Sequence, residues 1–213
     1  MIEGLHRGPD GAVRCWWAGD DETYGRYHDE EWGVPIGDER TLFELLCLEG
    51  FQAGLSWITI LRKREAFRHA FAGFDPEVVA SFGDDDVERL MADAAIVRNR
   101  AKIEAVIGNA RSALAMAPGE LATLIWVAET SPEDRPAVVD AEAVRALVTS
   151  PGAVVLSKAL KARGWRFVGP TTLYALLQSA GVVNDHLHGC PRRDVCEAAR
   201  AGFERPRAPG WLA

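Results

Sequence analysis

The sequence lacks the features that mark membrane-spanning, secreted and repetitive proteins. No apolar run approaches the length of a membrane span, and residues 1–14 lack the basic-then-apolar pattern of a signal peptide. There is also no internal repeat and no low-complexity segment. The 213 residues, 48% of them hydrophobic, suffice for one good-sized domain or two small ones that share a cleft. We therefore expect a cytoplasmic location and no membrane partner.

The chain also has no excess of positive charge. Its formal net charge of −7 argues against a general polyanion binder, because the field of the whole chain repels phosphates at long range. Basic residues nevertheless gather in three clusters, each of which fits either a solvated helix face or a local phosphate contact. The clusters are Arg62, Lys63, Arg64 and Arg68; Arg98, Arg100 and Lys102; and Lys158, Lys161, Arg163 and Arg166.

Alternating strand pairs are absent, whereas helix start signals are common. Asp38 precedes a long apolar helical pattern, and Asp75-Pro76 combines an N-cap with a first-turn proline. Residues 100–117 form a strong amphipathic pattern that ends before a Pro-Gly pair. The sequence therefore predicts an all-α protein of many short helices, preceded by a flexible leader at residues 1–13.

One carboxylate, Glu49, stands alone in the apolar and uncharged stretch 47–57. Helical spacing brings it to the edge of an apolar face, where an unpaired buried carboxylate is costly or takes a raised pKa. Two interpretations stay open: Glu49 points outward at a fraying helix end, or Gly50 and Gly54 bend the backbone so that it enters a pocket. Such a pocket would be lined by Glu49, Gln52 and Trp57.

The four cysteines do not fit a disulfide framework, because Cys47 lies in an apolar helical pattern typical of a buried thiol. Cys15 lies thirteen positions before His28, and His186 lies four before Cys190. Two thiolates and two imidazoles are a ligand set for one zinc ion, which would be structural because no position is left for water. The plainer alternative is that these are ordinary polar and buried side chains. His188 and Cys196 stand outside the predicted set.

A glycine-marked turn joins two predicted helices near residue 164. Residues 158–163 end one helical pattern, and the next helix runs from about Thr171 to Gly181. A hydrophobic-glycine turn that opens a helix points backbone N–H groups outward, which suits a DNA phosphate. A plain helix–helix turn also fits this segment.

Four motifs, in chain order, carry a resemblance to a known family. They are Arg14-Cys15-x-Trp17; Tyr24-x-x-Tyr27-His28-Asp29-x-Glu31-Trp32-Gly33-Val34-Pro35; Leu48-Glu49-Gly50-x-Gln52-Ala53-Gly54-Leu55-Ser56-Trp57-Ile58-Thr59; and Asp185-His186-x-x-Gly189-Cys190. Together they resemble the 3-methyladenine DNA glycosylase I family, a zinc-containing branch of the helix-hairpin-helix base-excision glycosylases.

The resemblance implies an all-α, two-lobed helix-hairpin-helix fold with a pocket between the lobes. It implies a glycosylase domain at residues 14–190, whose terminal segments are tied by one structural Zn²⁺, and a C-terminal tail at residues 191–213. The implied activity is hydrolysis of the N-glycosidic bond of 3-methyladenine in alkylated double-stranded DNA by a monomer, with release of the free base. The implied metal ligands are Cys15, His28, His186 and Cys190.

The resemblance also assigns roles in base recognition and DNA binding. Glu49 takes the catalytic and base-recognition role, with Tyr27 and Trp57 as stacking partners. Gly54-Leu55 fills the gap left by the flipped nucleotide, and the hairpin at residues 167–172 binds the DNA backbone. Further substrate-binding residues are Tyr24, Trp17 and Gln52, and the hairpin residues expected on DNA are Val168, Gly169, Thr171 and Thr172.

Two positions depart from the wider pattern. Phe51 stands where the family commonly has a polar residue, so we expect the pocket rim to differ. The wider superfamily commonly uses a catalytic aspartate near Asp185, but we do not assign Asp185 that role.

Because 3-methyladenine in DNA is cationic, its glycosidic bond is already weakened and little acid catalysis is needed. Aromatic faces and one carboxylate then suffice for selection.

Two other functions remain open from the sequence. The first is a zinc-stapled, non-enzymatic DNA- or damage-binding module, in which Glu49 faces outward and the hairpin does the binding. The second and weaker one is a metallohydrolase, which loses catalysis on chelation without unfolding.

Overall fold

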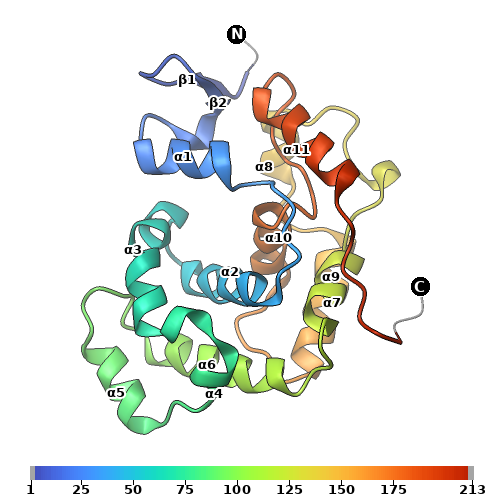
Figure 1. The fold of residues 1–213 in the computed structure, drawn as a ribbon. Coiled ribbons are helices and arrows are strands. Elements are labelled where there is room, and N and C mark those ends of the chain that lie inside the picture. Colours follow the sequence, from blue (N-terminus) through green and yellow to red (C-terminus); the bar gives the residue numbers. More distant parts are fainter. Residues whose placement is uncertain (1–2, 211–213) are drawn as a thin grey trace.

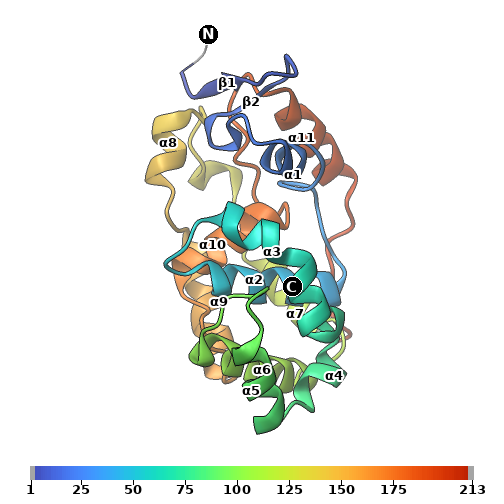
Figure 2. The ribbon, with the colours of Figure 1, turned by 90° about the vertical axis from the view of Figure 1, so that its left-hand side faces the viewer.

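The computed structural model describes residues 3–210, which are mostly helical, as expected (Figures 1 and 2). Short 3-10 helices lie at Trp16–Ala18, Ala72–Phe74 and Pro132–Asp134. The α-helices are α1 Glu22–Glu30, α2 Glu39–Gln52, α3 Trp57–Ala70, α4 Pro76–Ala80, α5 Asp84–Ala92, α6 Arg100–Leu114, α7 Glu120–Val127, α8 Ala141–Ala146, α9 Pro151–Ala162, α10 Pro170–Ser179 and α11 Pro191–Gly202.

The expected helix starts are confirmed where a side chain caps the first turn. The Asp38 carboxylate accepts the backbone N–H of Thr41 at 2.8 Å, which starts α2. Asp75 accepts the N–H of Glu77 at 3.0 Å directly before Pro76, the first residue of α4. These caps satisfy N–H groups that have no partner inside the helix.

The expectation of a leader without regular structure is wrong for the strands β1 (Leu5–Arg7) and β2 (Val13–Cys15). They pair antiparallel, with Leu5 opposite Cys15, so the described part is not strictly all-α. Strands of three residues are too short to show the alternation by which strands are found in a sequence. The pairing fixes the backbone of Cys15.

The expected C-terminal tail, as far as residue 210, is packed against the rest of the protein. Helix α11 buries Cys196 against the body of the protein and lies beside β2. Beyond it, the backbone N–H of Ala208 donates to the Thr123 hydroxyl at 2.7 Å. Helix α11 therefore lies near the N-terminal strands, as Figure 1 shows for β2 and α11, and the chain after it runs on to α7.

Helix α2 is the centre around which the other elements pack. Every residue from 42 to 51 is buried, and the helix contacts α3, α6, α7 and α10. A helix that is buried on all sides belongs to the core. In Figure 1, β1, β2, α1, α8 and α11 lie above α2, and α3–α6 lie beside and below it, so α2 separates two groups of elements.

The segment Ala141–Ala162 has the length and mean hydropathy, 1.3, of a possible membrane span, and 28% of its apolar window is buried. The expectation that no run approaches this length is therefore too strict. The structure divides the segment into α8 and α9, and α9 starts with its own Ser150 cap. A helical break in the middle weakens the evidence for a span.

The close approach of Gly181, just after α10, to the backbone of Val34 gives a stability prediction. Gly181 has φ +68°, and an added Cβ would lie 2.5 Å from the carbonyl carbon of Val34, whereas Gly108 inside α6 has open space. Gly181→Ala is expected to lower the free energy of unfolding by about 3 kcal/mol or more. Gly108→Ala, the matched control, should raise it by roughly 0.5–1 kcal/mol. Urea denaturation measures the free energy of unfolding of both variants. An unchanged midpoint for Gly181→Ala would contradict the close approach of Gly181 to the backbone of Val34.

Candidate functional site

A cavity of about 310 Å³ lies between the two groups of elements that α2 separates. Its walls come from the N-terminal aromatic segment, from α2 and α3, from α8 and from α10. Sequence reasoning found the first three and missed the other two. The lining residues are Trp17, Tyr24, Tyr27, Trp32, Glu49, Gln52, Trp57, Val144, Leu147, Val148, Thr171, Tyr174, Ala175 and Gln178.

Glu49 lies inside this cavity and not at a frayed helix end, because its side chain is 4% exposed and α2 continues to Gln52. Oε1 accepts a hydrogen bond from the Ser179 hydroxyl at 3.3 Å, and Oε2 has no partner among the described residues. The outward interpretation is therefore wrong. The expected bend at Gly50 is also wrong, because Gly50 is helical and its bare face accommodates Phe167.

Burial dominates the electrostatics of Glu49. Loss of hydration raises the pKa of the carboxyl group to about 8, and the hydrogen bond from Ser179 opposes this shift weakly. The indole Nε1 of Trp57 is likewise buried without a partner. Unpaired buried polar groups are costly, so the cavity holds an acceptor and a donor that a ligand can satisfy.

The aromatic side chains form one continuous wall. The rings of Tyr27 and Trp57 have centroids 5.6 Å apart at an angle of 49°, and Trp17 lies 5.0 Å from Tyr24 and 6.3 Å from Tyr27. A planar base between two parallel rings needs about 7 Å, twice the ordinary carbon–carbon contact distance. Tyr27 and Trp57 are therefore adjoining walls, and a base can stack on either face. Loss of hydration raises the pKa of Tyr24 to about 12.

The wall formed by α10 is held by Asp185. Its carboxylate is fully buried and accepts the Tyr174 hydroxyl at 2.8 Å and the Gln178 amide at 2.7 Å, and it pairs with Arg135. With its oxygens committed to three donors, Asp185 serves to orient Tyr174 and Gln178. This arrangement agrees with leaving Asp185 out of the catalytic residues.

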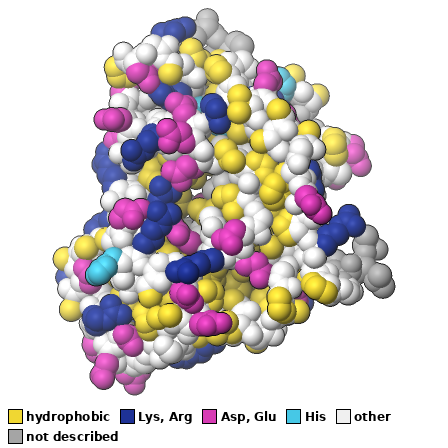
Figure 3. Space-filling model, viewed as in Figure 1, with side chains coloured by type: hydrophobic (Ala, Val, Ile, Leu, Met, Phe, Trp, Pro, Cys, Tyr) yellow, Lys and Arg dark blue, Asp and Glu magenta, His cyan; other side chains and the backbone are white. Residues whose placement is uncertain are grey.

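The remaining wall is apolar and comes from Val144, Leu147 and Val148 in and after α8. No local pattern indicates this wall, because these residues lie nearly one hundred positions from Glu49 and an apolar pattern alone does not reveal what it packs against. They complete the lining of the cavity. Figure 3 shows apolar surface exposed near the centre of the face that it draws.

The two segments expected on DNA are close to the cavity but differ in exposure. Gly54 has φ +81° in the turn between α2 and α3, and Leu55 beside it is 43% exposed. In the turn between α9 and α10, Val168 is buried and its carbonyl accepts the Ser157 hydroxyl at 2.6 Å. Gly169 is the N-cap residue of α10, Thr172 lies in its first turn, and Thr171 lines the cavity.

The basic cluster on α3 is largely engaged in ion pairs. Arg64 pairs with Glu31, and Arg68 donates to Glu44 at 2.8 Å. Arg62 pairs with Asp21 in the cap of α1. Figure 3 shows the acidic and basic side chains interspersed over this part of the surface. These pairs tie α3 to α1 and α2, so this cluster is not a free phosphate site.

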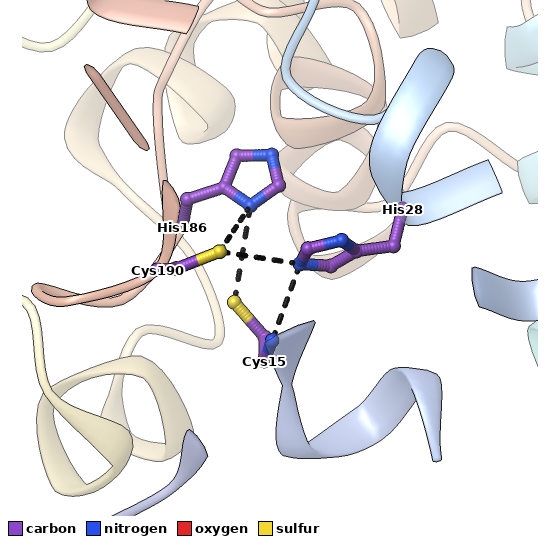
Figure 4. A group of neighbouring side chains, drawn as sticks. All are labelled: Cys15, His28, His186 and Cys190. Atoms are coloured by element: carbon purple, nitrogen blue, oxygen red, sulfur yellow. Dashed lines mark hydrogen bonds between the residues drawn. The ribbon is translucent and has the colours of Figure 1, made fainter. Parts of the chain in front are cut away.

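The four predicted metal ligands come together in one buried cluster (Figure 4). Their ligand atoms all lie within 4.8 Å of one another, although β2, α1 and the segment before α11 supply them. The Cys190 sulfur lies 3.6 Å from His28 Nε2 and 3.6 Å from His186 Nδ1, and the Cys15 sulfur lies 3.8 Å from His186 Nδ1. His188 and Cys196 lie outside the cluster, as expected.

Neighbouring groups fix the orientation of both imidazoles. His28 donates from Nδ1 to Asp29 at 2.8 Å, and His186 donates from Nε2 to the carbonyl of Trp32 at 2.9 Å. Each ring therefore presents its unprotonated nitrogen to the centre of the cluster, which is the form that binds a metal. Tetrahedral zinc with sulfur and nitrogen ligands has ligand–ligand edges of about 3.6 Å, so the Cys–His separations of 3.6 and 3.8 Å fit such an ion.

Known proteins resemble this chain over most of its length. Residues 17–193 match the family model described as methyladenine glycosylase. DNA-3-methyladenine glycosylase 1 of Escherichia coli is 50% identical over 180 residues, which are 83% of this chain and 95% of that protein. DNA-3-methyladenine glycosylase of Haemophilus influenzae is 46% identical over 183 residues, which are 84% of this chain and 97% of that protein.

Solved structures show the same similarity. A crystal structure of 3-methyladenine DNA glycosylase I matches with TM-score 0.78 and 45% identity, covering 84% of this chain and 98% of that one. A 3-methyladenine DNA glycosylase I variant in complex with 3-methyladenine matches with TM-score 0.73 and 34% identity, covering 84% and 97%. Since the family model spans most of the residues and the relatives are covered almost end to end, the chain belongs to the methyladenine glycosylase family.

Proposed function

We infer that the chain is a DNA-3-methyladenine glycosylase, which hydrolyses the N-glycosidic bond of 3-methyladenine in alkylated DNA and leaves an abasic site. Family membership supports this activity. The structural observation that carries it is the buried Glu49 carboxylate, which has an unpartnered oxygen in an aromatic-walled cavity. A cationic base with hydrogen-bond donors on its edge complements such a cavity.

In this proposal Glu49 selects the damaged base by charge. The methylated base in DNA is cationic. Its charge stabilises the buried carboxylate and so replaces the hydration that the carboxylate lost on burial. Oε2 accepts a hydrogen bond from the base edge, while Ser179 holds Oε1. Neutral adenine offers no compensating charge. Because the glycosidic bond of the cation is already weakened, recognition supplies much of the selectivity.

The aromatic wall and the two turns would act on the DNA. Tyr27 or Trp57 stacks on the extruded base, with Trp17, Tyr24 and Gln52 completing the pocket. Extrusion costs a few kcal/mol, which stacking and the insertion of Gly54-Leu55 into the vacated space offset. We propose double-stranded DNA as the partner of a monomer, because such insertion requires an opposite strand.

The α9–α10 connection would grip the backbone as a helix-hairpin-helix element. The N–H groups of Gly169, Thr171 and Thr172 lie at or near the N-terminus of α10, whereas Pro170 has none to offer. Backbone N–H groups and the positive end of the helix dipole suit a phosphate. Val168 contributes through its backbone, since its side chain is in the core.

We further propose that Cys15, His28, His186 and Cys190 hold one Zn²⁺ with a structural role. When bound, the ion ties the N-terminal segment to the segment before α11. The fit of the cluster to a tetrahedral edge length and the orientation of both imidazoles support zinc. Four protein ligands leave no position for a reacting water, which argues against the metallohydrolase.

The non-enzymatic binding module has weaker support. It requires Glu49 to face outward, and the side chain is 4% exposed inside a cavity. It also predicts affinity for damaged DNA without release of a free base, which chromatography of the bases released from methylated DNA would detect.

Removing the charge of Glu49 is expected to remove most of the activity. Glu49→Gln keeps the shape but loses the attraction to the cation, so the single-turnover rate of base release should fall about a hundredfold. Chromatography of the bases released from methylated DNA measures the rate. Glu65→Gln, an exposed carboxylate on α3, is the control. A wild-type rate for Glu49→Gln would contradict the role assigned to the carboxylate.

The raised pKa of Glu49 predicts a pH dependence. Only ionised Glu49 attracts the cation, and kcat/KM reports the pKa of the free enzyme, about 8. The value of kcat/KM should therefore rise as the pH increases toward about 8 and then level off. The slope should vanish in Glu49→Gln. A wild-type profile that is flat between about pH 6 and pH 9 would show that Glu49 is already ionised.

Loss of a metal ligand should unfold the protein rather than disable its chemistry. Cys190→Ser is expected to bind less than one zinc per chain and to lose several kcal/mol of stability, because zinc binding contributes to folding. Elemental analysis and thermal denaturation measure the two effects. His188→Ala, a histidine outside the cluster, should keep its zinc. A chelated protein that stays folded but inactive would instead indicate a catalytic metal.

A further inference from the structure

The second basic cluster contains a lysine that has turned inward. Lys102, on α6, is 8% exposed, and its Nζ donates to the carbonyl oxygens of Phe51 at 2.9 Å and Ala53 at 2.6 Å. Burial lowers its pKa. Both recorded partners of the ammonium group are backbone carbonyls.

Those two carbonyls end helix α2 and begin the turn that carries Gly54-Leu55. Carbonyls in the last turn of a helix have no partner inside the helix, and a cation there also matches the negative end of the helix dipole. Ala53 leaves the helix with φ −47° and ψ 114°, and the Leu55 N–H then donates to the Gln52 carbonyl at 2.6 Å. Lys102 therefore fixes the point from which the exposed Leu55 projects.

The same helix also holds the other segment proposed to contact DNA. Asn109 lies seven residues after Lys102, two turns along α6. Its side-chain oxygen accepts the N–H of Arg166 at 2.8 Å, and its amide donates to the Arg166 carbonyl at 3.1 Å. Arg166 immediately precedes the hairpin at residues 167–172. Helix α6 thus ties both turns to one rigid element.

A buried ammonium group is a costly way to fill space. An apolar side chain of similar length packs at lower cost where no position has to be specified. Hydrogen bonds from a charged donor are also stronger than neutral ones, so they restrict the two carbonyls more tightly. The free-energy cost of burying Lys102 is explained if the function of the protein depends on the geometry of the turn.

We propose that Lys102 is a positioning residue for strand opening: it fixes the Ala53–Leu55 turn so that Leu55 enters the duplex as the damaged base leaves it. This inference rests on the proposed glycosylase function and adds a residue that contacts neither the base nor the cavity. Lys102 acts on the DNA only through the turn.

The test compares paired and mismatched damage. An oligonucleotide with a single adenine is methylated and annealed opposite thymine or opposite a mismatched base, which lowers the cost of extrusion. Lys102→Met should release 3-methyladenine from the paired duplex about tenfold more slowly than wild type, with a clearly smaller defect on the mismatched duplex. Its affinity for free 3-methyladenine, measured by tryptophan fluorescence, should be unchanged. Lys102→Arg should restore part of the paired rate.

Lys63→Met is the matched control, because Lys63 also donates to two backbone carbonyls, those of Ala94 and Ala95, away from the turn. Lys63→Met should show no defect in the rate of base release that depends on whether the damaged base is paired or mismatched. A wild-type rate for Lys102→Met on paired DNA would overturn the proposal, as would an equal defect on both duplexes together with weaker binding of the free base. If wild type releases no base from either duplex, the glycosylase function fails instead.

Discussion

A carboxylate held away from water without a counter-ion is the constraint on which the rest of this structure depends. Ser179 supplies the only hydrogen bond that Glu49 receives within the described residues, and burial raises its pKa to about 8. Helix α2 can hold the group there because its neighbours bury it on every side. In the proposed function, the free energy spent on burying Glu49 would be recovered when a cation binds, so the same cost would favour a damaged, positively charged base over a neutral one.

The metal cluster and the cavity are coupled through neighbouring residues of α1. Tyr27 lines the cavity, while His28 beside it presents Nε2 to the Cys190 sulfur and to the backbone N–H of Cys15 (Figure 4). Trp32 connects the same regions, since its ring lies on the cavity and its carbonyl orients His186. A metal ion in the cluster would therefore hold the aromatic wall of the cavity in place. In the proposed function, a structural zinc and base recognition would be parts of one arrangement.

Local signals in the sequence predicted much of this structure, and tertiary contacts decided the rest. Asp38 and Asp75 mark helix starts because capping is a short-range interaction. The four Cys and His residues of the cluster were found because few residue types can form such a set. The β1–β2 pair was missed because three-residue strands show no alternation, and Gly50 was misread as a bend because its contact with Phe167 is visible only in three dimensions. Lys102 and the α8 wall were missed for the same reason: their partners lie far away in the sequence.

The ionisation state of Glu49 can be observed directly by carbon NMR of its side-chain carboxyl group, with Glu49→Gln identifying the signal. In the free protein the signal should titrate near pH 8, so that the group is mostly protonated at pH 7. Saturation with 3,9-dimethyladenine, in which a methyl group on N9 replaces the sugar and keeps the base cationic, should at pH 7 shift the signal to the position of a carboxylate. A signal that titrates near the ordinary pKa of glutamate, or one that does not respond to the base, would contradict the claim that a buried carboxylate selects the cation.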